Sequence, residues 1–166
     1  MIKSNYCNIC GSKLEKRINK NEFNLEYNFC PKCNTFKFEK FNVACSMIVF
    51  NKDKTKVCLV KQYGHDEYIL VAGYIMQGEN AEVALKREIE EELGVSSNII
   101  SFNETRFFAK SNTLMMNFAV SVDESLINTN EEIDSFQFFL IEDAKKEIKE
   151  NSLAKEFLID YLNKIK

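Results

Sequence analysis

The chain has 166 residues, a net charge of −3 and an apolar fraction of 45%, which are typical of a globular protein with one ordinary core and a small appended module. This slightly acidic balance offers no general attraction to nucleic acid or to anionic membranes, so an anionic substrate must be bound by local groups. The N-terminus has no apolar signal segment, and the longest apolar run, residues 68–76, is too short to span a bilayer. The sequence therefore predicts a cytoplasmic protein without a membrane segment.

Six cysteines in a chain without a secretory signal indicate metal ligands or core thiols rather than disulfides. Four of them form two C-x-x-C pairs, Cys7 with Cys10 and Cys30 with Cys33. This spacing is typical of two knuckles that close on one tetrahedral Zn²⁺, and four thiolates leave no position for water, so we expect a structural zinc. The alternative is four reduced surface thiols. The segment between the pairs holds few large apolar side chains, so metal binding should supply its folding free energy.

The basic side chains of this N-terminal module are interleaved with glutamates, and they lack the aromatic pattern on which bases stack. Nucleic-acid binding is therefore the less favoured interpretation of the module. The remaining cysteines, Cys45 and Cys58, fall in apolar stretches that predict two strands joined by a polar turn, residues 43–50 and 57–63. We expect both thiols to be small buried apolar groups rather than reactive ones.

A third extended segment, residues 68–75, leads to a loop and then to a predicted helix over residues 81–93. Asn80 has the side chain expected of an N-cap, and Gly94 stands where a left-handed C-terminal residue is expected. At 100° per residue the apolar side chains of this helix form one continuous arc. The arc comprises Ala81, Ala84, Leu85, Ile89 and Leu93.

Glu88 and Glu92 fall inside that apolar arc, and Glu91 lies at its edge. A run of glutamates is most often a solvated face, and Glu82 and Glu90 are expected to be partly that. Two carboxylates one turn apart on the core-facing side would each lose several kcal/mol of hydration and would repel one another. A bound Mg²⁺ or Mn²⁺ removes both penalties, so the pattern favours a divalent metal site.

Residues 73–95, GYIMQGENAEVALKREIEEELGV, resemble the Nudix box at each of its fixed positions. The resemblance implies an α+β fold, the Nudix α/β/α sandwich around a mixed sheet, over residues 38–166. The cysteine spacing predicts a small zinc ribbon ahead of it, over residues 1–37. The resemblance also implies metal-assisted hydrolysis of a diphosphate bond with Mg²⁺ or Mn²⁺.

The resemblance assigns a role to each charged residue of the box. Glu88 and Glu92 are the principal metal ligands, and Glu91 is a further ligand or the base that deprotonates water. Arg87 and Glu79 form a structural ion pair, and Gly73 and Gly94 are required by the backbone. Relatives often take a further metal ligand from the acidic loop before the last strand, where Glu131 and Glu132 are the candidates and Glu131 matches slightly better by its distance from the FQFF segment.

A zinc ribbon ahead of the box is similar to the NADH pyrophosphatase branch of the family, which cleaves dinucleotides to two mononucleotides. That branch usually carries a further N-terminal domain, whereas this chain begins at the ribbon. Its serine-glutamine-proline-tryptophan-proline-phenylalanine-proline element has no counterpart in residues 105–118, and the chain contains no Trp. We therefore expect a relative with altered nucleotide selectivity, and homodimers are implied by resemblance alone.

Beyond the box, residues 99–108 and 113–122 predict two strands joined by a polar turn. Phe107 and Phe108 are candidates for stacking on a base, although adjacent strand residues point to opposite faces and at least one should pack in the core. A final amphipathic helix is expected after an N-cap at Ser152. His65 is expected to be a loop residue rather than a general base.

The favoured function is hydrolysis of a nucleoside diphosphate linked to another moiety, with dinucleotides such as NADH or NAD leading. ADP-ribose and other nucleotide sugars come next. A different class of function, a non-catalytic nucleotide or RNA-binding regulator on the same fold, is less favoured because Glu88, Glu91 and Glu92 are all present.

Overall fold

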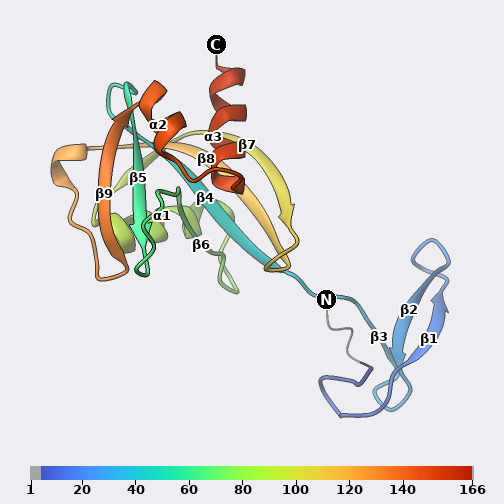
Figure 1. The fold of residues 1–166 in the computed structure, drawn as a ribbon. Helices are drawn as coiled ribbons and strands as arrows, with labels where there is room; N and C mark the ends of the chain where they lie inside the picture. Colours follow the sequence, from blue (N-terminus) through green and yellow to red (C-terminus); the bar gives the residue numbers. More distant parts are fainter. Residues whose placement is uncertain (1–4, 166) are drawn as a thin grey trace. The chain divides into compact units, whose positions relative to one another are not determined.

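A computed structural model describes residues 5–165 and divides the chain into two compact units, with the boundary between Phe41 and Asn42 (Figure 1). Among the helices described, none is both long and apolar enough to cross a bilayer.

The first unit is an antiparallel sheet in the order β1-β2-β3. Its strands are β1 (Glu15–Asn19), β2 (Leu25–Cys30) and β3 (Thr35–Lys37). Its buried apolar side chains within residues 5–41 are few: Cys7, Phe29 and Cys30. Such a small core cannot offset the conformational entropy of folding, so this unit needs an additional constraint.

The second unit is built on a mixed sheet in the order β7-β8-β4-β5-β9, with β6 paired to β4. The β4–β8 pair is parallel, and the other strand pairs are antiparallel. Its strands are β4 (Asn42–Asn51), β5 (Lys56–Gln62), β6 (Val71–Tyr74), β7 (Ser97–Phe108), β8 (Thr113–Val122) and β9 (Ile133–Leu140). Its helices are α1 (Ala81–Leu93), α2 (Ile141–Glu147), α3 (Leu153–Lys164) and the 3₁₀ turn η1 (Glu124–Leu126).

Helices cover both faces of this sheet (Figure 1). Alternate residues of β4 reach opposite sides, since Met47 and Val49 pack with α1 whereas Ile48 and Phe50 pack with α2 and α3. The second unit is thus the predicted α/β/α sandwich with a mixed sheet, and α1 is one of its outer layers.

The ends of α1 form as the sequence predicts. The Asn80 Oδ1 accepts the backbone N–H of Val83 at 2.9 Å, and Gly94 adopts the left-handed conformation with φ 64°. The hydroxyl of Ser152 caps α3 in the same way, accepting the backbone N–H of Lys155 at 3.1 Å. These caps fix where α1 begins and ends, and therefore which way its glutamates face.

Cys45 and Cys58 are both fully buried in the sheet, as expected of small apolar side chains. Burial raises the pKa of Cys45 to about 11 and that of Cys58 to about 12. Both groups are therefore neutral thiols at neutral pH, which fits core packing rather than nucleophilic chemistry.

Candidate functional site

The glutamates of α1 differ in exposure as the helical arc predicts. Glu92 is a buried residue with only 3% of its surface exposed, and the Glu88 side chain is 13% exposed. The Glu91 side chain, at the edge of the arc, is 55% exposed. Glu82 and Glu90 lie on the exposed side of the helix. The two carboxylates assigned by resemblance as principal ligands are thus the two that face the sheet.

Strand β6 makes room for Glu88 at Gly73. A Cβ atom added to Gly73 would lie 1.9 Å from the carboxyl carbon of Glu88, which is far shorter than any non-bonded contact of a real Cβ atom. The backbone of Gly73 has no left-handed strain, so space is the reason for a glycine here. Because Gly73 pairs with Cys45 on the central strand, the carboxylate of Glu88 is held against the middle of the sheet.

Arg87 joins the box loop to the helix through four hydrogen-bonding partners. Its Nε and Nη2 donate to the two carboxylate oxygens of Glu79 at 2.7 and 3.0 Å, and Nη2 also donates to the carbonyl of Tyr74 at 3.0 Å. Its Nη1 donates to Glu88 at 2.8 Å and to Glu91 at 2.9 Å. The guanidinium of Arg87, followed by the backbone N–H of Met76, lowers the pKa of Glu79 to about 2. The ion pair expected from the resemblance is therefore formed.

Glu92 is the most perturbed carboxylate of the site. Burial, and then the negative charges of Glu88 and Glu132, raise its pKa to about 8. Its Oε2 accepts a hydrogen bond from the Nε2 of Gln62 on β5 at 2.7 Å, which partly offsets that shift. A buried carboxylate among like charges fits an oxygen-preferring divalent cation, because such a cation compensates both burial and repulsion.

The loop between η1 and β9 is fastened to the end of α1 by main-chain hydrogen bonds. The N–H of Asn128 donates to the carbonyl of Leu93 at 2.9 Å, and the N–H of Asn130 donates to the carbonyl of Glu92 at 3.3 Å. These bonds satisfy helix-end carbonyls that would otherwise lack partners. They also bring the acidic residues of the loop toward Glu92.

Of the two acidic candidates in this loop, Glu132 is the one with contacts to the site. Its Oε2 accepts the hydroxyl of Tyr63 at 2.9 Å, and its charge acts on Glu92. Glu131 is exposed, and no hydrogen bond or ion pair among residues 5–165 joins it to the acidic groups of α1. A metal-binding role stays a prediction for both candidates, and the contacts favour Glu132, whereas distance along the chain favours Glu131.

Sequence reasoning missed Gln62 and Tyr63. Gln62 continues the row of β5 residues that face α1, after Cys58 and Val60, and it is 8% exposed. A polar amide at the end of an apolar row was the available signal. His65 lies just beyond, exposed in the turn, as expected of a loop residue.

Strand register separates the two candidate aromatic residues. Phe107 pairs with Leu114, and its neighbour Arg106 pairs with Met115, which packs on the α3 side. Because side chains alternate along a strand, Phe107 faces the α1 side and Phe108 the other. Phe107 is 49% exposed on the side that carries the acidic residues. Base stacking by either ring stays a prediction.

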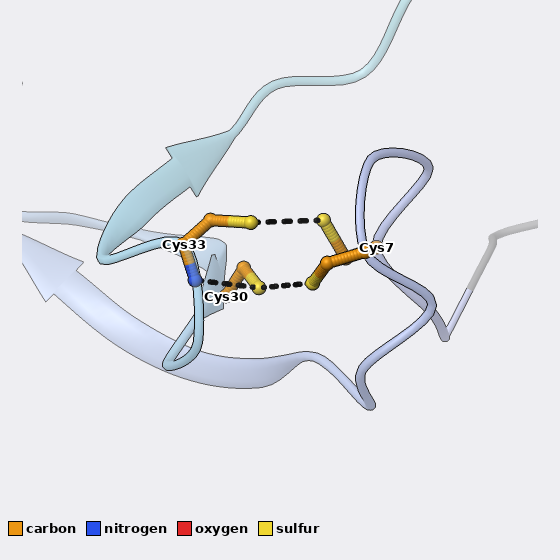
Figure 2. A group of neighbouring side chains, drawn as sticks. Cys7, Cys30 and Cys33 are labelled. Atoms are coloured by element: carbon orange, nitrogen blue, oxygen red, sulfur yellow. Dashed lines mark hydrogen bonds between the residues drawn. The ribbon is translucent and has the colours of Figure 1, made fainter.

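The four cysteines of the two C-x-x-C pairs come together in the first unit, where Cys30 and Cys33 face Cys7 (Figure 2). Their sulfur atoms all lie within 4.8 Å of one another, with 3.9 Å between Cys7 and Cys33 and 3.5 Å between Cys10 and Cys30. Backbone N–H groups point at two of the sulfurs, Ile9 to Cys7 and Cys33 to Cys30.

Hydrogen bonds from Ser12 lower the pKa of Cys10 to about 6, whereas the hydrogen bond with Cys10, followed by burial, raises the pKa of Cys33 to about 12. Without a cation the thiols therefore do not all ionise together, and a bound metal would favour the thiolate at every position. The cluster therefore has the ligand type and spacing of a four-cysteine zinc site. Within residues 5–165, no group of three or more acidic side chains brings its ligand atoms together as these thiols do. Carboxylates repel one another, and Arg87 holds both Glu88 and Glu91.

Comparison with curated proteins finds relatives along most of the chain. NAD-capped RNA hydrolase NudC from Stutzerimonas stutzeri (strain A1501) is 23% identical over 158 residues, which are 95% of this chain and 55% of the relative. The protein of the same name from Vibrio parahaemolyticus serotype O3:K6 is 25% identical over 137 residues, 81% of this chain and 50% of the relative. The chain thus spans about half the length of the curated relatives it matches.

Solved structures show the same fold at low identity. A NUDIX hydrolase from Nitrosomonas europaea superposes with a TM-score of 0.74 at 20% identity, covering 97% of this chain and 92% of that chain. An Ap4A hydrolase from C. elegans superposes with a TM-score of 0.63 at 17% identity, covering 75% of this chain and 97% of that chain. The model of the NUDIX domain matches residues 40–161, which is most of the chain. With the box residues arranged as described, the chain belongs to the Nudix hydrolase family.

Proposed function

We propose that this protein hydrolyses the diphosphate bond of a nucleoside diphosphate linked to a second moiety, and that a dinucleotide such as NADH or NAD is the leading substrate. The observation that carries the proposal is the burial of Glu92 beside Glu88 and Glu132: burial, and then repulsion by these two carboxylates, raise the pKa of Glu92 to about 8. Protein folding alone does not favour such an arrangement, whereas a divalent cation at this position stabilises it.

In this proposal Glu88 and Glu92 hold Mg²⁺ or Mn²⁺ with carboxylate oxygens, and Glu132 or Glu131 adds a ligand from the loop after η1. When bound, the metal neutralises diphosphate charge and lowers the pKa of bound water. Glu91 is exposed and lies on the same helix one residue from Glu92, which suits it to accept a proton from an attacking water. Arg87 and Glu79 keep the box loop against the helix, so the ligands are positioned before substrate arrives.

The choice of a dinucleotide rests on the relatives. The curated proteins that match the chain are named NAD-capped RNA hydrolases, and their substrates carry a dinucleotide at the end of an RNA. A free dinucleotide and the same group on RNA present the same bond to the site. ADP-ribose and other nucleotide sugars contain this bond as well and form the second class of substrates to test.

The first unit is proposed to bind one structural zinc. A tetrahedron with Zn–S bonds of about 2.3 Å has sulfur–sulfur edges of about 3.8 Å. The distances of 3.9 Å between Cys7 and Cys33 and 3.5 Å between Cys10 and Cys30 are close to that value. Four thiolates would fill the coordination sphere, so the zinc supports folding rather than catalysis.

The test is release of mononucleotides from NADH in the presence of Mg²⁺, with wild type compared with Glu92→Gln. The variant removes a charge but keeps the size of the side chain, and we expect its kcat to fall by at least about 100-fold because an electrostatic stabiliser of the transition state is lost. Glu90→Gln is the matched control, since Glu90 is exposed on the same helix. Equal activity of Glu92→Gln and wild type would contradict the proposal.

A panel of substrates then decides the class: NADH, NAD, ADP-ribose, diadenosine polyphosphates, nucleoside triphosphates and NAD-capped RNA, with products separated by chromatography. Preference for either NAD-containing group supports the leading proposal. Preference for ADP-ribose transfers the assignment to nucleotide sugars. Failure of every diphosphate, with nucleotide or RNA still bound, would identify a non-catalytic regulator instead.

A further inference from the structure

The end of β5 supplies two neutral hydrogen-bond donors to two acidic residues. Gln62 donates its amide N–H to Glu92 at 2.7 Å, and the next residue, Tyr63, donates its hydroxyl to Glu132 at 2.9 Å. Glu92 belongs to α1 and Glu132 to the loop before β9, so one dipeptide reaches both acidic segments.

The backbone at this point departs from a regular strand. The pairing of β5 with β9 shifts register between Lys61 and Gln62, and Tyr63 has a left-handed φ of 54°. A bulky residue in that region is strained by about 1–2 kcal/mol. The N–H of Gly64 donates to a carboxylate oxygen of Asp134 at 2.6 Å, which fastens the turn to β9. The strand end is thus held in an unfavourable conformation in which both side chains meet a carboxylate.

The chemistry of the two donors matters because the carboxylates must still bind a cation. A Lys or Arg at position 62 would neutralise Glu92 and compete with a metal, whereas an apolar side chain would leave a buried carboxylate without a partner. An amide fixes one oxygen of Glu92 and adds no charge. A phenol does the same for Glu132.

We propose that Gln62 and Tyr63 are positioning residues of the metal site: they orient the carboxylates of Glu92 and Glu132 for a divalent cation. This inference rests on the proposed function, because it takes both carboxylates as metal ligands. Groups of this kind, outside the ligand set, typically change metal affinity by about 10- to 100-fold when they are removed.

The test measures Mn²⁺ binding to the full chain by electron paramagnetic resonance, without substrate. Gln62→Met keeps the length of the side chain and removes the donor, and we expect its dissociation constant for Mn²⁺ to rise by about 10-fold or more. Tyr63→Phe removes one hydroxyl from an exposed side chain, and we expect a rise of about 2- to 10-fold, as for one neutral hydrogen bond. Normal Mn²⁺ affinity in either folded variant overturns the proposal.

A matched control pair joins the segment before β6 to β9. The hydroxyl of Tyr68 donates to the side-chain oxygen of Gln137 at 3.4 Å, and within residues 5–165 neither side chain is hydrogen-bonded to Glu88, Glu92 or Glu132. Gln137→Met and Tyr68→Phe should bind Mn²⁺ like wild type. If Gln62→Met does not fold, Tyr63→Phe decides, because loss of an exposed hydroxyl leaves the core intact.

Two further measurements separate positioning from general stability. The Mg²⁺ concentration for half-maximal activity should rise by the same factor as the Mn²⁺ dissociation constant, while the KM for the nucleotide at saturating Mg²⁺ stays unchanged. In a Glu92→Gln background, Gln62→Met should weaken Mn²⁺ binding no further, because its effect passes through Glu92. If the losses of Mn²⁺ affinity from Gln62→Met and Glu92→Gln add up in the double variant, the proposal is overturned.

The outcomes also distinguish this inference from the proposed function. If wild type binds Mn²⁺ through Glu92 but cleaves no dinucleotide, the proposed substrate is refuted. The roles of Gln62 and Tyr63 can then still be tested by Mn²⁺ affinity. If Glu92→Gln binds Mn²⁺ as tightly as wild type, the proposed function and this inference are both refuted. If Glu92→Gln weakens Mn²⁺ binding but Gln62→Met binds Mn²⁺ as tightly as wild type, only this inference is refuted.

Discussion

At Gly73, a hydrogen atom in place of a methyl group leaves the space that the carboxylate of Glu88 occupies. Glu88 lies directly against the β6 backbone, where the carboxyl carbon would be 1.9 Å from an added Cβ. The φ of Gly73 lies outside the left-handed region, so alanine is acceptable to the backbone itself. The Nudix box glycine is explained here by space for the carboxylate of Glu88, which is proposed as a metal ligand.

Gly73→Ala should therefore displace the Glu88 carboxylate and destabilise the protein by about 1 kcal/mol, the low end for overpacking, because the atoms that the new methyl group meets are the end of a flexible side chain. Mn²⁺ affinity should fall with it. Both effects are measured by urea unfolding and by Mn²⁺ titration. The control is the same substitution in a Glu88→Ala background, where the clash is absent and Gly73→Ala should be nearly neutral for stability. Equal destabilisation in both backgrounds would show that the glycine serves another purpose.

At the residue scale, periodicity predicted which glutamates face inward, because burial on a helix repeats every 3.6 residues whatever the partner. It did not find Gln62 or Tyr63, whose contacts depend on the strand register and on a left-handed turn. The sequence favoured Glu131 over Glu132 only by its distance along the chain from the FQFF segment. The loop is fixed instead by hydrogen bonds to the α1 carbonyls, which no local pattern encodes.

At the element scale, the end of α1 serves both as a helix terminus and as a docking point for the acidic loop. Gly94 has a φ of 64°, and a Cβ added to it would lie 2.4 Å from the carbonyl oxygen of Asn128. The same loop donates the N–H of Asn130 to the carbonyl of Glu92. Gly94 thus lets the loop approach the helix closely enough to bring Glu132 toward Glu92.

Gly94→Ala should destabilise the protein by more than the roughly 1 kcal/mol expected from a left-handed alanine alone, because the loop must also move. It should weaken Mn²⁺ binding as well. Gly64→Ala is the matched control, since Gly64 has a similar φ of 73° and nothing within 4 Å of an added Cβ. Thermal unfolding of the two variants isolates the contact with Asn128. If Gly94→Ala and Gly64→Ala lose the same amount of stability, the strain of a left-handed alanine explains both effects.

Element boundaries followed from caps, whereas sheet pairing did not. The helix over residues 81–93 was predicted from Asn80 and Gly94, and α1 has those bounds. The extended segment predicted over residues 68–75 is a strand only from Val71 to Tyr74, because Tyr68 and Ile69 make isolated bridges to Ile148 and Val60. The strand order, with β8 parallel beside β4, depends on packing between distant segments and had no local signal.

At the scale of the whole molecule, the two units differ in what stabilises them. The second unit buries large apolar side chains on both faces of its sheet, in one cluster around Leu85 and Ile89 and another around Phe157 and Leu158. The first buries Phe29 beside two cysteines within residues 5–41. A difference of this size in buried apolar area implies that the second unit folds by its own core, whereas the first needs a further constraint, for which we propose the zinc held by its four cysteines.

Removal of zinc with a strong chelator should therefore unfold the first unit and leave the second folded. Backbone amide resonances of residues 5–41 should lose their dispersion, while those of the sandwich keep theirs, and released zinc should amount to about one ion per chain, as four thiolates bind one Zn²⁺. Cys30→Ser should give the same spectrum without chelator. Cys58→Ala, which changes a buried thiol of the sheet, should retain the zinc. Dispersed resonances for the first unit after complete zinc removal would show that its strands are stable without a metal.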